Sequence, residues 1–219
     1  MFRAAIFDMD GTLVDSEVYW REAEQEVFGS VGLRITDEMS AVTAPLSPRQ
    51  VTEHWYSVRP WAGPTLAQME SAVIERVAEK MRENCRALPG VREVLAHCAR
   101  RGWRVALASN SPAQLCHLVL RELGIADCFA AVISVDDVER GKPDPAIYLL
   151  AARRLGVQPG ECLAFEDSLV GVRAARAAGM SVVAIAPGLC FPEAEAPHLV
   201  LGALHEFGDQ HSATLWERQ

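Results

Sequence analysis

The chain has 219 residues, 50% of them hydrophobic, which is enough to bury the core of one domain with or without a modest insertion. Its formal net charge of −8 argues against binding to nucleic acid or to a membrane surface, because both would repel an acidic protein. No segment resembles a signal peptide or reaches transmembrane length, so we expect a cytoplasmic protein. The six cysteines form no C-x-x-C pair, which predicts reduced thiols.

The first predicted element is a strand at Ala4–Phe7, where four apolar residues follow one another without alternation. This pattern is typical of a strand covered on both faces. Two carboxylates and a glycine, Asp8, Asp10 and Gly11, follow at once. An Asp-Gly pair between apolar runs also favours a hairpin, so the motif by itself leaves a functional and a structural interpretation open.

Residues 15–87 contain no strand-like run but several segments of helical period, and we expect an inserted helical cap there. Ser47 followed by Pro48 is typical of a helix start, and so is Thr65. A stripe of apolar side chains follows Thr65 at spacings of three and four, formed by Leu66, Met69, Val73, Val77 and Met81. Such a stripe predicts core packing rather than a cofactor site.

From residue 88 onward, short helices and strands alternate, which predicts an α/β fold. We expect strands at Arg104–Ala108, 131–135, 162–165 and 181–186, and helices at 89–101, 112–124, 145–155 and 169–178. Ser111 is the expected N-cap of the second of these helices, and the polar tail after Gly208 is expected to fray. Parallel strands joined by helices place their carboxyl ends at one edge, where such sheets bind ligands.

Polar side chains follow four of these strands at their carboxyl ends, namely Asp8 with Asp10, Ser109, Lys142, and Glu166 with Asp167. Each has an ordinary structural explanation, because Ser109 suits a turn, Lys142 an exposed loop and Asp167 a helix N-cap. Together they suit phosphoryl transfer, in which one carboxylate is the nucleophile and a second moves a proton. A phosphate beside several carboxylates needs a hard cation, and oxygen ligands favour Mg²⁺.

The order of these motifs resembles that of the haloacid dehalogenase superfamily over nearly the whole chain. The matching motifs are D-x-D-G-T at 8–12, the strand-terminal Ser109, the lysine of G-K-P-D-P at Lys142, and the acidic pair of F-E-D-S at Glu166 and Asp167. The resemblance implies a Rossmann-like parallel-sheet core built from residues 1–14 and 88–219, with a small α-helical cap at 15–87.

The same resemblance implies roles for the catalytic residues. Asp8 would attack phosphorus and form an aspartyl phosphate, and Asp10 would act as the general acid and base. Lys142 would neutralise charge on the nucleophile and the phosphate.

Binding roles are implied as well. The Ser109 hydroxyl, the Asn110 backbone N–H and Gly11 would lie against the phosphate. The expected Mg²⁺ ligands are Asp8, the backbone carbonyl of Asp10, and Asp167, with Glu166 either coordinating the ion or supporting a ligand.

Two branches of the superfamily fit less well. Asp10 disfavours the dehalogenases, which lack an acid at the matching position. Residues 15–60 contain no lysine of the kind that the phosphonate-cleaving enzymes need. A phosphomonoester phosphatase and a β-phosphoglucomutase-type sugar phosphomutase remain. The related mutases carry a histidine where this chain has Trp20, and an indole neither titrates nor accepts a hydrogen bond, which favours hydrolysis.

The cap segment 55–64, together with residues 15–17 and 19–20, resembles the hexitol phosphatases, also described as 2-deoxyglucose-6-phosphate phosphatases. A hexose or hexitol 6-phosphate substrate is implied. Trp55, Tyr56 and Trp61 either stack on a sugar or form the cap core, and Trp20 and Arg49 are expected to reach the substrate. Arg49 lies two positions beyond the arginine of related caps. A phosphoglycolate phosphatase and a non-catalytic binding module are weaker alternatives, and we expect a monomer.

Overall fold

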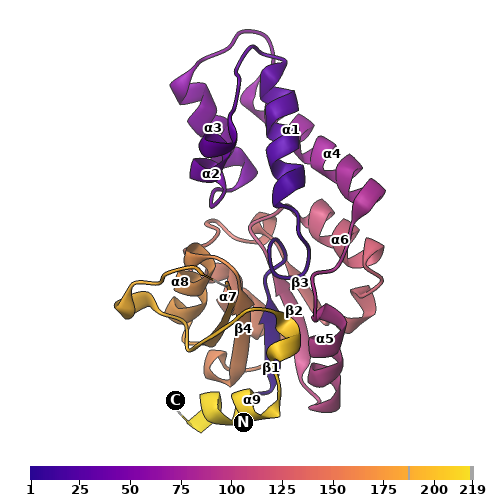
Figure 1. Ribbon diagram of the computed structural model, residues 1–219, viewed down its shortest axis with the longest axis vertical. Helices are drawn as coiled ribbons and strands as arrows, with labels where there is room; N and C mark the ends of the chain where they lie inside the picture. Colours follow the sequence, from indigo (N-terminus) through magenta and orange to yellow (C-terminus); the bar gives the residue numbers. More distant parts are fainter. Residues whose placement is uncertain (187, 218–219) are drawn as a thin grey trace. The chain divides into compact units, whose positions relative to one another are not determined.

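The computed structural model describes residues 1–186 and 188–217, and the chain divides into two compact units. One unit comprises Met1–Asp15 and Arg86–Gln219, and the other comprises Ser16–Cys85. Figure 1 shows the strands in the first unit, which we call the core unit, and helices α1 to α4 in the second, which we call the helical unit.

The described residues of the core unit form a six-stranded parallel sheet in the order β3-β2-β1-β4-β5-β6. The strands are β1 (Ala4–Phe7), β2 (Arg104–Ala108), β3 (Ala131–Ile133), β4 (Cys162–Glu166), β5 (Ser181–Ile185) and β6 (Leu199–Leu201). Phe7 at the end of β1 pairs with Leu107 and with Phe165. The carboxyl ends of the three central strands therefore lie level with one another, and the predicted α/β class with a Rossmann-like parallel sheet is confirmed.

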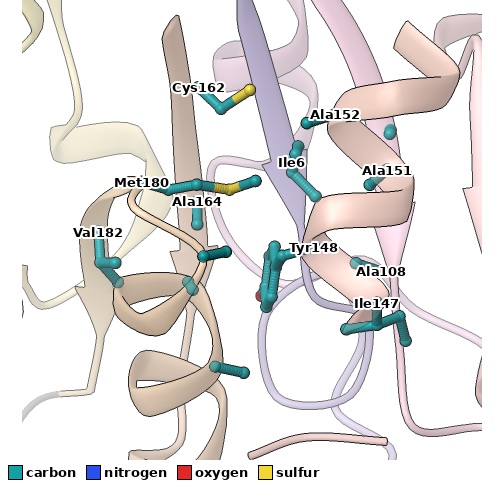
Figure 2. Close-up of a cluster of buried hydrophobic side chains, with 14 of the residues drawn as sticks. Ile6, Ala108, Ile147, Tyr148, Ala151, Ala152, Cys162, Ala164, Met180 and Val182 are labelled. Atoms are coloured by element: carbon teal, nitrogen blue, oxygen red, sulfur yellow. The ribbon is translucent and has the colours of Figure 1, made fainter. Parts of the chain in front are cut away.

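Helices cover both faces of this sheet, as doubly wound α/β folds require. Figure 1 shows α5 (Val91–Arg100) and α6 (Ala113–Glu122) on one side, and α7 (Ala146–Leu155) and α8 (Leu169–Ala177) on the other. Beneath α7 and α8 lies a cluster of buried side chains, seen in Figure 2, in which Tyr148 of α7 lies beside Ile6 and Ala164. The side chains of the alanines at 106, 108 and 164 are small, and this leaves room for the large Tyr148 ring.

Most predicted elements of the core unit are confirmed, but three expectations are wrong. Ser111 is not the N-cap of α6, which begins at Ala113 after Pro112, because its hydroxyl bonds to Asp10 instead. The strand expected to reach residue 135 ends at Ile133, since a 3₁₀ turn begins at Val135.

The third wrong expectation concerns the tail after Gly208, which does not fray within the described residues. It forms α9 (Asp209–Glu217), with Leu215 buried and the Trp216 ring 5.2 Å from that of Phe2.

The helical unit contains α1 (Glu17–Gly29), α2 (Asp37–Thr43), α3 (Pro48–Val58) and α4 (Leu66–Asn84). The predicted starts are confirmed, because Ser47 and Thr65 each form a capping box with a glutamine three residues on. Four members of the predicted α4 stripe are buried, whereas Leu66 is only partly so. No helix in the described part of the chain is both long and apolar enough to cross a bilayer.

Candidate active site

Three carboxylates meet where β1 and β4 end. Asp8 follows β1, Glu166 is the last residue of β4, and Asp167 comes next in the chain. Because β1 and β4 are parallel neighbours in register, the acids share one edge of the sheet. One oxygen from each lies within 4.8 Å of the other two. The sequence predicted this meeting of the acids.

Lys142 supplies the positive charge at this edge, from the loop between β3 and α7. Its ammonium Nζ lies 2.5 Å from Oδ1 of Asp8 and 2.6 Å from Oε1 of Glu166, and the side chain is almost fully buried. Burial by itself would lower the pKa of Lys142, but the charges of Asp8 and Glu166 raise it above its ordinary value. The lysine therefore stays protonated and bridges two carboxylates.

The single positive charge of Lys142 does not balance the negative charges of three carboxylates in this buried site. Burial raises the pKa of Asp8 well above its ordinary value, against the opposing effect of Lys142. Burial and then the charge of Glu166 raise the pKa of Asp167 to about 7. An added divalent cation would favour the ionised form of both acids. The donor set of clustered carboxylate oxygens therefore fits a hard cation.

Glu166 is less available to such a cation than its neighbours. It is fully buried, and its Oε1 accepts hydrogen bonds from Lys142 and from the hydroxyl of Tyr148. Its Oε2 accepts a weaker bond from the Ser168 hydroxyl at 3.4 Å. Asp8 and Asp167 are the acids of the cluster with more open oxygens.

Tyr148 is a member of this network that the sequence analysis missed. Burial, followed by the charges of Glu166 and Asp8, raises the pKa of Tyr148 well above its ordinary value, so the phenol remains a donor. A buried tyrosine usually finds a partner for its hydroxyl, so its place on the buried face of the helix expected at 145–155 was the available signal.

Asp10 is held by hydroxyl groups from the loop after β2. Ser111 Oγ donates to Asp10 Oδ2 at 2.6 Å, Ser109 Oγ lies 3.5 Å from the same oxygen, and the Ser111 N–H donates to Ser109 Oγ at 3.0 Å. The two serines therefore position the Asp10 carboxylate, and Ser111 is a site residue that the sequence analysis had assigned to helix capping.

Gly11 is required where the chain turns between Asp10 and the following residues. Its φ is +75°, which disfavours side chains, and a Cβ there would overlap the Asp167 carboxylate.

Asn110 contacts Lys142 through its side chain. Its Oδ1 accepts from the Lys142 backbone N–H at 2.8 Å, and its Nδ2 donates to the Lys142 carbonyl at 3.2 Å. A Cβ at Gly141 would overlap this amide. Only the backbone N–H of Asn110 was expected to bind phosphate, so the side-chain contact with Lys142 is new.

The remaining predicted site residues, Trp20 and Arg49, belong to the helical unit. Arg49 is 77% exposed and pairs with Glu53 at 3.0 Å one turn away, and Trp20 is partly buried. Their contact with substrate stays a prediction.

Among the cap aromatics, Trp55 is buried in the helical unit. Trp61 packs against Phe28 and Tyr56, and its indole N–H donates to the carbonyl of Pro64. Both tryptophans therefore contribute to packing within this unit.

Fold and site together define an α/β enzyme whose acidic centre lies at the carboxyl edge of a parallel sheet. Residues 2–179 match the family model described as haloacid dehalogenase-like hydrolase, and the chain belongs to this family. The predicted superfamily and the predicted class of enzyme, a hydrolase, are thereby confirmed.

Two curated relatives are phosphatases by name. Over 186 residues, 84% of each chain, the protein is 41% identical to Hexitol phosphatase B of Escherichia coli strain K12. It is 34% identical over 187 residues to Fructose-1-phosphate phosphatase YqaB of the same strain, covering 83% of this chain and 95% of the relative. The predicted resemblance to hexitol phosphatases is confirmed.

Among solved structures, CbbY from Rhodobacter sphaeroides in complex with phosphate superposes with a TM-score of 0.87 at 27% identity. The match covers 95% of this chain and 97% of that one. The folds therefore agree over nearly their full lengths.

Proposed function

We propose that this protein is a Mg²⁺-dependent phosphomonoester hydrolase that acts on small sugar or sugar-alcohol phosphates, of the hexose or hexitol 6-phosphate type. The observation that carries the proposal is the buried Lys142 ammonium, 2.5 Å from Asp8, beside an acidic group able to hold a cation. The names of two relatives, Hexitol phosphatase B and Fructose-1-phosphate phosphatase YqaB, support the broader class of sugar and sugar-alcohol phosphates.

In the first step, an oxygen of Asp8 attacks phosphorus and the bond from phosphorus to the substrate oxygen breaks. Asp10 gives its proton to the leaving alkoxide, which departs as the alcohol. In the second step, water attacks the aspartyl phosphate while Asp10 takes its proton. Inorganic phosphate leaves and the Asp8 carboxylate is restored. Ser109 and Ser111 direct Asp10 during both proton transfers.

The residues that would hold Mg²⁺ are Asp8 and Asp167 through their carboxylates and Asp10 through its backbone carbonyl, with Glu166 supporting the set. The bound ion supplies positive charge that offsets the phosphate dianion. Lys142 offsets the remaining charge at Asp8. The Ser109 hydroxyl, the Asn110 backbone N–H and Gly11 line the phosphate site in this proposal.

We assign substrate selection to the segment predicted as a cap, residues 15–87, on a catalytic core of 1–14 and 88–219. The division of the chain into units at 15/16 and 85/86 supports these limits. Trp20 and Arg49 are the cap residues proposed to meet the substrate. The acidic charge is consistent with a cytoplasmic monomer that takes small phosphorylated molecules.

The proposal is tested by phosphate release across hexose and hexitol phosphates, phosphoglycolate and nucleotides, with Mg²⁺ and with a chelator. Conversion of β-glucose 1-phosphate to glucose 6-phosphate is followed in parallel. We expect metal-dependent release that favours hexose or hexitol 6-phosphates. Isomerisation faster than release would instead show a mutase, and metal binding without turnover would show a binding module.

A further inference from the structure

Tyr148 touches the catalytic network that the proposed function requires, yet no step of that mechanism uses it. Its ring is fully buried, and its hydroxyl donates to Oε1 of Glu166. The same oxygen accepts from Lys142 Nζ at 2.6 Å, and this ammonium lies 5.2 Å from the centre of the Tyr148 ring. One tyrosine therefore contacts both members of the Lys142–Glu166 pair.

Lys142 has two competing partners. Its Nζ lies 2.5 Å from Oδ1 of Asp8 and 2.6 Å from Oε1 of Glu166. In a buried site both carboxylates attract the ammonium strongly, because little water screens them. A hydrogen bond from a phenol to Glu166 offsets part of the charge on that oxygen and weakens its attraction for the lysine. More of the ammonium's hydrogen bonding then remains for Asp8.

We propose that Tyr148 is a positioning residue, whose hydroxyl on Glu166 sets how Lys142 is shared between Glu166 and Asp8. The inference rests on the proposed function, since it concerns phosphoryl transfer at Asp8. Without the hydroxyl, Glu166 holds Lys142 more tightly and the ammonium is drawn away from Asp8. Because Tyr148 acts through Glu166 and Lys142, its loss slows the reaction rather than weakening substrate binding.

The test compares the full-length wild type with Tyr148→Phe, which keeps the buried ring and removes only the hydroxyl. Phosphate release from sorbitol 6-phosphate and from p-nitrophenyl phosphate is measured at saturating Mg²⁺, with kcat corrected for the folded fraction. We expect kcat to fall about tenfold, because the free energy lost is about that of one hydrogen bond to a charged group. KM should stay within about twofold of the wild-type value.

The matched control is Ile147→Val, at the neighbouring position of α7. Ile147 is fully buried but takes no part in the polar network, so its variant loses stability by packing alone. Its kcat per folded molecule stays at the wild-type value. A purely structural Tyr148 would behave in the same way as this control.

A double-mutant cycle with Glu166→Gln tests the route of the effect. In the Glu166→Gln background, Tyr148→Phe should change kcat by less than about twofold, because the charge that the hydroxyl offsets is gone. A wild-type kcat in Tyr148→Phe, a change confined to KM, or an equal loss in both backgrounds would each overturn the inference. If wild type releases no phosphate from any substrate, the proposed function itself fails.

Discussion

The two units treat buried carboxylates in opposite ways. In the core unit, Asp8 and Glu166 share the ammonium of Lys142 at 2.5 and 2.6 Å. In the helical unit, Glu24 of α1 is only 7% exposed, and its Oε2 has no hydrogen-bond partner among the described residues. Burial, with no cation to oppose it, raises the pKa of Glu24 to about 7. Similar burial therefore accompanies carboxylates that share a cation in the core unit and a carboxylate without one, among the described residues, in the helical unit.

This difference separates two consequences of burying a charge. Burying a cluster of paired charges costs desolvation free energy, but the pairing holds the side chains in a fixed geometry, which suits a reaction centre. An unpaired buried carboxylate costs stability once it ionises. Two more buried polar atoms of the helical unit, Ser40 Oγ and Trp55 Nε1, also have no hydrogen-bond partner within the described residues. We therefore expect substitutions in the core network to act on activity, with a loss of stability where they leave its carboxylates without the lysine. Substitutions at Glu24 should act on stability.

The largest expected effect is that of Asp8→Asn. An amide is a poor nucleophile and cannot form the aspartyl phosphate, so turnover should fall about 10⁴-fold or more. Glu166 keeps its pair with Lys142, so thermal unfolding should change little. Phosphate release and a melting curve on the same preparation check both points. Undiminished hydrolysis by a folded variant would disprove a covalent role for Asp8.

The next effect is on stability, from Lys142→Met. Removing the shared cation leaves Asp8 and Glu166 buried without their ion pair, at an expected cost of about 3–5 kcal/mol in the free energy of unfolding. Lys80→Met is the control, because Lys80 pairs with Glu22 and Glu26, which are about half exposed. Its cost should stay below about 1 kcal/mol. Urea denaturation compares the two, and equal losses would show that burial of the pair does not matter.

Glu24→Gln should raise stability. A carboxyl whose pKa is higher in the folded protein binds protons more tightly there, so its contribution is complete below its unfolded pKa and disappears as the pH rises. Between pH 4.5 and about 7 the wild type should lose up to about 3 kcal/mol through this group.

The measurement is urea denaturation from pH 4 to 8, read as the difference between wild type and Glu24→Gln. The free energy of unfolding of the variant should increase relative to that of wild type as the pH rises. Glu17→Gln, at the exposed first residue of the same helix, should differ from wild type by less than about 0.5 kcal/mol at pH 8. A constant difference across the pH range at Glu24 would show that its carboxylate is not desolvated.

The smallest structural effect is expected for Arg49→Ala. The exposed ion pair with Glu53 contributes little, so the unfolding midpoint should not move measurably. Because Arg49 is proposed to contact the substrate, the KM of the variant for sorbitol 6-phosphate should rise while its kcat stays at the wild-type value. Steady-state kinetics measure both constants, and an unchanged KM would remove Arg49 from the proposed site.

The sequence predicted the positions of Asp8 and Glu166 because parallel strands align their carboxyl ends, so residues at the ends of neighbouring strands must meet. Lys142 lies in a longer loop after β3, which ends at Ile133, and its place in the site was implied by the resemblance of its motif. It did not predict the hydrogen bond between Tyr148 and Glu166, which depends on how closely α7 packs on the alanines of the sheet. The misassignment of Ser111 has a similar cause, since a serine before Pro-Ala satisfies capping preferences whether or not a carboxylate lies within reach. Local patterns therefore located the strand ends but not the contacts between elements.

The helical unit shows the same limit. Capping boxes at Ser47 and Thr65 were predictable because all their atoms lie within four residues of chain. The burial of Glu24 was not, because a glutamate on an amphipathic helix ordinarily faces water. Only the packing of α1 in the unit reveals it.

The central claim is that Asp8 becomes phosphorylated, and trapping that species tests it most directly. The enzyme is mixed with sorbitol 6-phosphate and Mg²⁺, quenched during turnover, and treated with borohydride, which reduces an acyl phosphate to the alcohol. Mass spectrometry of the peptide that contains residue 8 should then show homoserine in place of Asp8, and only when both substrate and metal are present. Rapid turnover with an unmodified Asp8, or modification at another carboxylate, would contradict the account.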